Sequence, residues 1–121
     1  MTIRNATAGD RAALLRLLAA GGIAEARLDA PAILLFDGAA PIGMACFDFA
    51  HNLLCGWYIT PYYLARGTGV PLLEAAEDRL RRAGCREAHW QAPPDSPFRP
   101  LFEARGWRPE PDHPGRYRRT L

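Results

Sequence analysis

The chain has 121 residues, 49% of them hydrophobic, which is enough for one compact domain (residues 1–121) and leaves no room for a second. The formal net charge of +2 is too small to predict binding to nucleic acid, although all fifteen basic residues are arginine. No apolar run is long enough to cross a bilayer and no basic-then-apolar leader follows Met1, so we expect a soluble, cytoplasmic protein without a membrane partner.

The first half of the chain predicts a strand, two helices and a three-stranded antiparallel meander. Thr2–Arg4 is β-prone, and Thr7 with Asp10 has the capping-box pattern of a helix that ends at Gly21-Gly22. Ile23 to Ala30 predicts a short second helix. Three β-prone segments separated by turn residues then predict the meander, with strands at 33–36, 42–49 and 53–60.

The second half predicts two helices and two strands. The clearest helix ends at Gly84 and places an apolar stripe on one face, formed by Leu73, Ala76, Leu80 and Ala83. Its other face would carry four-apart ion pairs, Glu77 with Arg81 and Asp78 with Arg82. Arg86 to Gln91 follows a helical crossover, so it is predicted to lie parallel to the strand that ends at Thr60.

The end of the chain completes the expected fold. Ser96-Pro97 is predicted to cap a short helix that ends at Gly106, and Tyr117 to Leu121 reads as a final strand. The expected fold class is α+β (mixed α/β). One central, mostly antiparallel sheet of about six strands would carry three to four helices on its faces.

A glycine-bearing turn joins the strand at 53–60 to the long helix. Gly67 and Gly69 let the backbone approach a ligand, and the helix start offers unpaired N–H groups, so the turn predicts a bound phosphate. A nucleoside-triphosphate loop would close with Gly-Lys-Ser or Gly-Lys-Thr, and this chain has no lysine. A dinucleotide-binding turn would lie near the start of a βαβ unit, whereas this turn is mid-chain.

Two segments in this order of elements carry a family resemblance. The turn Leu64-Ala65-Arg66-Gly67-Thr68-Gly69 lies mid-chain, and Leu101-Phe102-Glu103-Ala104-Arg105-Gly106-Trp107 lies near the end. With Thr60-Pro61-Tyr62-Tyr63 before the turn and Leu72-Leu73 after it, nearly the whole chain resembles the GNAT superfamily of acyl-CoA-dependent N-acyltransferases. The resemblance implies acetyl-CoA as cosubstrate and an amine on a small molecule or peptide as acceptor.

The resemblance also implies where acyl-CoA binds. It would lie where the strand ending at Thr60 parts from the strand at 86–91. Main-chain groups of Trp57, Tyr58 and Ile59 would pair with the pantetheine amides, and a backbone N–H near Ile59 would stabilise the oxyanion. The pyrophosphate would be held by N–H groups of Ala65, Arg66, Gly67, Thr68, Gly69 and Val70. The side chain of Arg66 either helps a CoA phosphate or points to water.

One residue departs from the pattern of the family, and this difference leaves two functions open. Phe102 stands where many relatives have a tyrosine that protonates the departing thiolate, and phenylalanine has no proton to give. The first reading is an N-acetyltransferase that relies on positioning, and the alternative is a non-catalytic acyl-CoA-binding module. The nearest candidate bases for the incoming ammonium are Asp48 and His51, on the preceding strand and turn.

Cys46, Cys55 and Cys85 are too scattered for a disulfide framework and lack the spacing of a metal site, so we expect reduced thiols and no metal. Cys55 has no histidine partner beside it and is predicted to pack in the core. The short chain leaves the acceptor side open, and a homodimer would close it.

Overall fold

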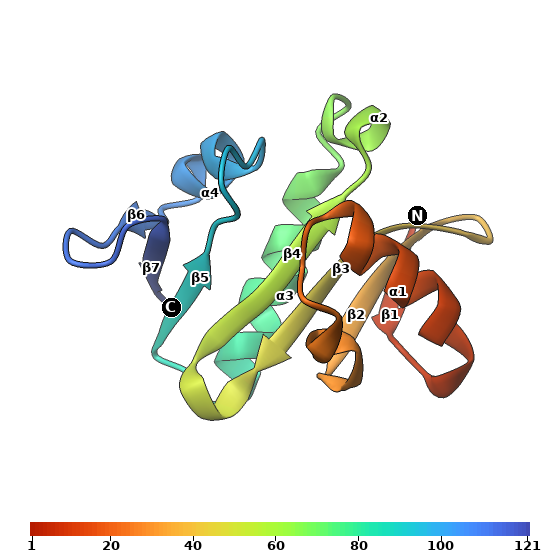
Figure 1. Cartoon of the computed structure of the whole chain (residues 1–121), viewed down its shortest axis with the longest axis horizontal. Helices are drawn as coiled ribbons and strands as arrows, with labels where there is room; N and C mark the ends of the chain where they lie inside the picture. Colours follow the sequence, from red (N-terminus) through yellow and green to blue (C-terminus); the bar gives the residue numbers. More distant parts are fainter.

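The computed structural model covers residues 1–121 and contains one seven-stranded sheet with helices on both faces (Figure 1). The strand order is β1-β2-β3-β4-β5-β7-β6. Neighbouring strands are antiparallel except β4 and β5, which are parallel as predicted from the helical crossover. The α+β fold with a mixed sheet is confirmed, with one strand more than expected because Arg108–Pro109 forms a short edge strand, β6, on β7.

The strands are β1 (Thr2–Asn5), β2 (Ala32–Asp37), β3 (Ala40–Asp48), β4 (Leu53–Ile59), β5 (Glu87–Gln91), β6 (Arg108–Pro109) and β7 (Arg116–Thr120). The α-helices are α1 (Arg11–Ala20), α2 (Pro61–Leu64), α3 (Gly69–Arg82) and α4 (Arg99–Ala104). Three short 3-10 segments are η1 (Ala8–Asp10), η2 (Glu25–Asp29) and η3 (Phe49–His51). No helix is both long enough and apolar enough to span a bilayer.

The helix predicted from Ile23 to Ala30 is only the short 3-10 segment η2, and two of the α-helices also differ from the sequence prediction. Helix α2 was not predicted, because a single turn of helix is too short to show a periodic pattern. Helix α4 begins at Arg99 rather than at Ser96-Pro97. The Ser96 hydroxyl instead accepts a hydrogen bond from the N–H of Phe98 (3.2 Å), which makes a turn just before the helix.

The predicted capping box is present at η1, which leads directly into α1. The Asp10 carboxylate accepts hydrogen bonds from the N–H of Thr7 (2.7 Å) and from the Arg4 guanidinium (2.7 and 2.9 Å). These bonds hold the pKa of Asp10 well below its usual value of 3.8, and the bond from Arg4 contributes most to this shift. At the other end, Gly22 adopts a left-handed φ of 65° and terminates the helix.

Because the folded-state pKa of Asp10 is lowered, its ionised form stabilises the fold above the unfolded-state pKa, and this contribution is lost as the pH falls through the folded value. We therefore expect Asp10→Asn to lower the free energy of unfolding at neutral pH. The deficit relative to wild type should shrink as the pH is lowered from about 5. Urea unfolding at a series of pH values measures this, and a deficit that stays constant down to about pH 2 would argue against the charge as its cause.

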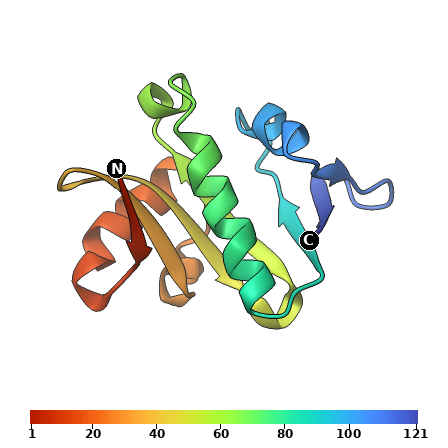
Figure 2. The ribbon, with the colours of Figure 1, turned by 180° about the vertical axis from the view of Figure 1, so that it is seen from behind.

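Helices α1 and α3 cover opposite faces of the central strands (Figure 2). Leu14, Leu17 and Leu18 of α1 belong to a smaller buried cluster with residues of β2 and β3. The predicted stripe of α3 enters the larger cluster through Leu73, Ala76 and Leu80, and Leu72 joins it. Ala83, the fourth residue of the predicted stripe, is exposed because α3 ends at Arg82.

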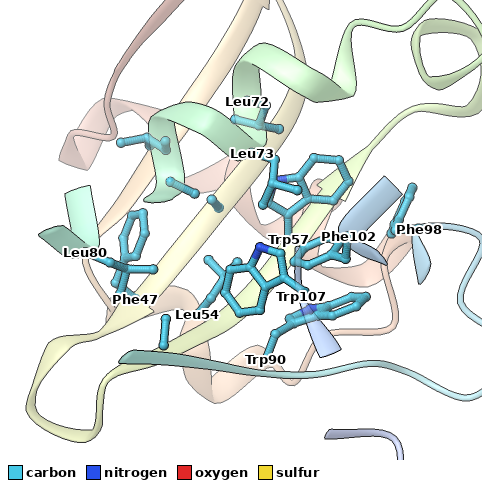
Figure 3. Packing of buried hydrophobic residues seen from close by; sticks show 14 of the residues in the cluster. Phe47, Leu54, Trp57, Leu72, Leu73, Leu80, Trp90, Phe98, Phe102 and Trp107 are labelled. Atoms are coloured by element: carbon cyan, nitrogen blue, oxygen red, sulfur yellow. The ribbon is translucent and has the colours of Figure 1, made fainter. Parts of the chain in front are cut away.

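Aromatic rings fill the larger cluster where α4 lies against the sheet (Figure 3). Trp90 of β5 stacks on Phe102 of α4 with ring centroids 3.6 Å apart. Phe102 also meets Trp57 and Trp107 edge to face, with centroids 5.4 and 5.3 Å away. All four rings are buried. This packing joins β4, β5 and α4 through side chains.

A buried carboxylate ties α3 to the end of the chain. Glu77 is 0% exposed and accepts hydrogen bonds from Trp107 Nε1 (3.0 Å), Arg119 Nε (3.0 Å) and Arg105 Nη2 (2.5 Å). The bond to Glu77 raises the pKa of Arg105 above its usual value. The predicted pairing of Glu77 with Arg81 on an exposed face is therefore wrong, whereas Asp78 and Arg82 do pair at 3.0 Å.

Candidate active site

Strands β4 and β5 pair over only two residues before they separate. The parallel register joins Leu53 with His89 and Leu54 with Trp90, and no later pair is formed. Beyond these residues the strands diverge, β4 toward α2 and β5 toward α4 (Figure 1). The parting of the two strands predicted from the sequence is present, and it leaves one edge of β4 without a neighbouring strand.

Trp57 and Ile59 turn their main-chain groups toward this free edge. In the β3–β4 ladder, the N–H of Thr60 donates to the carbonyl of Ile42 (3.0 Å), and bonded residues alternate along an antiparallel strand. Tyr58, opposite Met44, is therefore bonded to β3. Of the three residues predicted to pair with pantetheine, Trp57 and Ile59 have main-chain groups free for it, and Tyr58 offers only its side chain.

Two adjoining cavities lie at the gap. The first, which we call the Tyr58 cavity, has a volume of about 520 Å³ and is bordered by Tyr58, Ile59, Leu64 and the segment 93–98. The second, the Cys55 cavity, has a volume of about 350 Å³ and is bordered by Arg27, Cys55, Gly56, Trp57, Trp90 and others. Both include Gly22, Pro93 and Pro94 in their walls. Each volume lies within the range of small-molecule sites.

The glycine turn is closed by its own hydrogen bonds. The N–H groups of residues 65–68 donate to carbonyls of Pro61, Tyr63 and Leu64 at 3.1 to 3.2 Å, and that of Val70 donates to Gly67 at 3.4 Å. Of the six amides predicted to hold a pyrophosphate, only that of Gly69 has no acceptor. The sequence pattern did not predict that the other five amides are already bonded, because it did not predict α2 and the turns after it, whose carbonyls accept these bonds.

The two glycines of the turn serve different purposes. Gly67 has a left-handed φ of 76°, which other residues adopt only with strain. Gly69 is buried, and a Cβ there would lie 2.9 Å from Leu101 Cδ2 and 3.1 Å from Trp57 Cη2. The first glycine therefore shapes the turn, and the second lets α3 begin directly against α4 and β4.

Arg66 folds back onto the turn. Its guanidinium carbon lies 3.4 Å from the centroid of the Tyr62 ring, and Nη1 donates a hydrogen bond to the Tyr62 carbonyl (3.0 Å). The side chain is thus held by a cation–π contact on the exposed side of α2.

Asp48, the last residue of β3, and His51, in the β3–β4 connection, lie at the opposite end of β4 from the glycine turn. Asp48 accepts a hydrogen bond from the His51 N–H (3.3 Å), and its carboxylate lies 2.8 Å from His51 Nδ1, which lowers the pKa of Asp48. Neither residue borders the two cavities; Asp48 approaches the Cys55 cavity through Arg27, at 3.9 Å. The two predicted bases therefore contact each other, but neither of them lies at the cleft.

Sequence reasoning missed Asp95 and Arg27. Asp95 has a left-handed φ of 55° and is the one carboxylate in the wall of the Tyr58 cavity. The turn signal around Pro93-Pro94 pointed to a loop there but not to a cavity. Cys55, expected in the core, is half-buried and borders the Cys55 cavity. Phe102 is fully buried and borders neither of the two cavities.

Comparison with known proteins agrees with this arrangement. The model of the acetyltransferase (GNAT) family matches residues 11–107. A GCN5-related N-acetyltransferase from Rhodopseudomonas palustris is 17% identical with a TM-score of 0.80, over 99% of this chain and 95% of that one. The PaiA N-acetyltransferase of Thermoplasma acidophilum, solved with coenzyme A, is 16% identical with a TM-score of 0.71 over all of both chains.

A larger protein shares the fold over part of its length. N-acetylglutamate synthase from Neisseria gonorrhoeae, solved with coenzyme A and N-acetyl-glutamate, is 21% identical with a TM-score of 0.73, over 99% of this chain and 35% of that one. A search of curated protein sequences found no match. The solved structures show a common fold at these identities, and the family model spans most of the sequence. The chain belongs to the GNAT acetyltransferase family.

Proposed function

We propose that residues 1–121 form one N-acetyltransferase domain that moves an acetyl group from acetyl-CoA to a primary amine by direct transfer in a ternary complex. The observation that carries the proposal is the free edge of β4 at Trp57 and Ile59, beside two adjoining cavities and next to a glycine turn. Membership of the GNAT family and the solved relatives with coenzyme A support it. The acceptor would be a small-molecule or peptide amine.

In this proposal, the main chain does most of the binding. The free N–H and carbonyl groups of Trp57 and the free carbonyl of Ile59 pair with the pantetheine amides as an added strand would, which leaves the N–H of Ile59 for the thioester. The amide of Gly69 meets the pyrophosphate first, and those of Ala65 to Val70 follow by exchanging their local carbonyl partners for phosphate oxygens. The exchange is favourable because hydrogen bonds to a charged acceptor are roughly twice as strong as neutral ones.

The chemistry would rest on positioning. A neutral amine attacks the thioester carbonyl, and the N–H of Ile59 stabilises the oxyanion. Holding the two reactants together supplies effective molarities of about 10⁵–10⁸ M, whereas a general acid is worth about 10²–10⁴ in rate. A thiol with a pKa of about 8.5 is a tolerable leaving group. Water can therefore protonate it in place of the tyrosine that many relatives carry at the position of Phe102.

The test is release of CoA thiol from acetyl-CoA in the presence of a panel of primary amines. Amino acids, polyamines and short peptides with free N-termini sample the acceptor classes. We expect thiol release that depends on one of these amines and mass-spectrometric detection of the N-acetyl product. Thermal stabilisation by CoA without release for any amine would instead support the second candidate below, and the absence of both would contradict the proposal.

A non-catalytic acyl-CoA-binding module is the second candidate. The observation that favours it is Phe102, which is fully buried against Trp90 and offers no proton at the position of the family's usual acid. A module of this kind would gain stability from acetyl-CoA, which a ligand that binds only the folded state provides by mass action. It would leave the thioester intact with every amine in the panel.

The positions of Asp48 and His51 give a further prediction. Because neither side chain borders the cavities, we expect Asp48→Asn and His51→Gln each to change turnover by less than about twofold, whereas loss of a general base costs about 10²–10⁴. Steady-state kinetics with the best amine measure this. A tenfold or larger fall in kcat for either variant, with CoA affinity unchanged, would show that the residue takes part in catalysis.

We also propose a cytoplasmic location. All three cysteines are free thiols in the structure, which fits a reducing compartment. Fractionation of cells that express the chain would test this, with recovery outside the cytoplasm as the opposing result.

A further inference from the structure

The spacing of the three cysteines predicted no disulfide framework, yet the fold brings two of the thiols together. Cys46 lies on β3 and Cys55 on the neighbouring strand β4, and their sulfur atoms are 3.2 Å apart. Both are free thiols in the structure, and so is Cys85. The sulfurs of a disulfide are about 2.05 Å apart, so these two need to approach each other by only about 1 Å more.

The contact between the two thiols follows from a β-bulge. Cys46 pairs with Gly56 and Phe47 pairs with Leu54, so Cys55 is the extra residue of β4. A bulge interrupts the regular alternation of side chains along a strand. Cys46 belongs to the smaller buried cluster, between the sheet and α1, and Cys55 packs against that same cluster. The pairing of two adjacent strands, and not the position of a loop, therefore places the sulfurs side by side.

Gly56 leaves the space that the Cys46 sulfur occupies. A Cβ at this position would lie 2.8 Å from Cys46 Sγ, which is closer than real Cβ atoms come. It would also lie 3.0 Å from two carbon atoms of Ile23. A side chain at residue 56 would therefore displace the sulfur, so the glycine allows the Cys46 thiol to reach Cys55.

The two thiols differ in their access from outside. Cys46 is 0% exposed, whereas Cys55 is half-buried and borders the Cys55 cavity. Arg27 borders the same cavity, and a nearby positive charge favours the thiolate, which is the reactive form of cysteine. A small oxidant that enters the cavity therefore meets Cys55 first, with Cys46 behind it.

We propose that Cys46 and Cys55 form a reversible disulfide when the protein meets a hydroperoxide. With hydrogen peroxide, the Cys55 thiolate attacks one oxygen, the O–O bond breaks, and hydroxide leaves, so Cys55 becomes a sulfenic acid. The Cys46 thiol then attacks the Cys55 sulfur, the S–S bond forms, and the hydroxyl group leaves with the thiol proton as water. The two sulfurs lose two electrons, which the peroxide gains. A dithiol reductant restores both thiols by exchange.

The probe in the test is hydrogen peroxide. The reduced full chain is treated with it, the excess is destroyed with catalase, and the remaining thiols are blocked with N-ethylmaleimide in urea. Before blocking, the oxidised chain should be two hydrogen atoms lighter, and it should take up one maleimide, on Cys85, where the reduced chain takes up three. Chymotrypsin can cut at Phe47 and Phe49, so a non-reducing digest should contain a Cys46 peptide linked to a Cys55 peptide. Dithiothreitol should separate the two peptides.

Matched variants separate this pair from general thiol reactivity. Cys85→Ala removes a thiol that borders neither cavity, and the variant should still form the bond. Cys46→Ala should leave Cys55 as a sulfenic acid that dimedone traps, and the wild-type chain should give much less of this adduct. Arg27→Gln should slow the oxidation by roughly three- to tenfold, because it removes the nearby positive charge.

The stability of the oxidised chain is the second measurement. It should unfold at a higher urea concentration than the reduced chain, because the bond restricts the unfolded chain and fits the folded one. Unfolding at a lower urea concentration would overturn the proposal. A bond that includes Cys85, or an oxidised chain in which Cys46 and Cys55 both still react with maleimide, would also overturn it. No step involves CoA, so these results do not depend on whether the chain transfers acetyl groups.

Discussion

Thr68→Glu is expected to weaken coenzyme A binding by about 10- to 100-fold while leaving the fold at least as stable as the wild type. Thr68 is the residue before α3, and its side chain makes no capping hydrogen bond. A carboxylate there would lie close to the pyrophosphate in the proposed complex. Two unit charges about 5 Å apart repel by roughly 3 kcal/mol near a protein surface, before screening by salt.

The same substitution should not harm the free protein. A negative charge at a helix N-terminus is usually stabilising by about 0.3–1 kcal/mol. Isothermal titration calorimetry measures the loss of affinity, and urea unfolding measures stability. Thr68→Gln is the matched control, because it has nearly the same shape without the charge and should bind CoA as the wild type does. Equal affinity of the Glu and Gln variants would show that the pyrophosphate lies elsewhere.

Glu77→Gln is expected to lower the free energy of unfolding by about 3 kcal/mol. The side chain is fully buried and accepts hydrogen bonds from Arg105, Trp107 and Arg119. Glutamine has almost the same volume but no charge, so two guanidinium groups would lose their counter-ion in a partly buried place. Breaking a buried ion pair by removing one partner is costly for this reason.

Glu74→Gln is the matched control for Glu77→Gln. Glu74 lies 3.7 Å from the same Arg105, but its side chain is 53% exposed, so its removal should cost less than about 1 kcal/mol. Urea unfolding of both variants gives the comparison. A Glu77→Gln variant as stable as the Glu74→Gln variant would mean that the network contributes little to the fold.

The hydrogen bonds of Glu77 with Arg105, Trp107 and Arg119 also help to keep the gap between β4 and β5 in shape. β4 and β5 are joined by only two residue pairs, so the β5 side needs other contacts to keep its position. Glu77 on α3 holds Arg119 of β7 and Trp107 beyond α4, and Phe102 of α4 packs between Trp57 and Trp90. Loss of the carboxylate should therefore weaken CoA binding as well as stability.

Local patterns predicted most of the fold. The apolar stripe of α3, the Thr7–Asp10 capping box and the turn residues of the meander each act over a few positions, so the sequence displays them directly. The parallel β4–β5 pair followed from one rule about helical crossovers. The family resemblance rested on short motifs in the right order, and it located the gap beside β4.

Features that depend on distant partners were missed. The burial of Glu77 follows from Arg105 and Arg119, which are far away in the sequence, while its local pattern with Arg81 pointed to an exposed pair. Asp48 and His51 are near β4 in the sequence, but they lie at its start, whereas the glycine turn follows its end. Asp95 and Arg27 border the cavities only because separate loops meet there.

The binding of acyl-CoA along the free edge of β4 is tested most directly by amide hydrogen exchange of the wild-type chain with and without saturating CoA. The amides of Trp57, Ile59 and Gly69 have no strand or turn partner, so they should exchange readily in the free protein and more slowly in the complex. Unchanged exchange at all three amides, with calorimetry showing that CoA is bound, would contradict this location of the site.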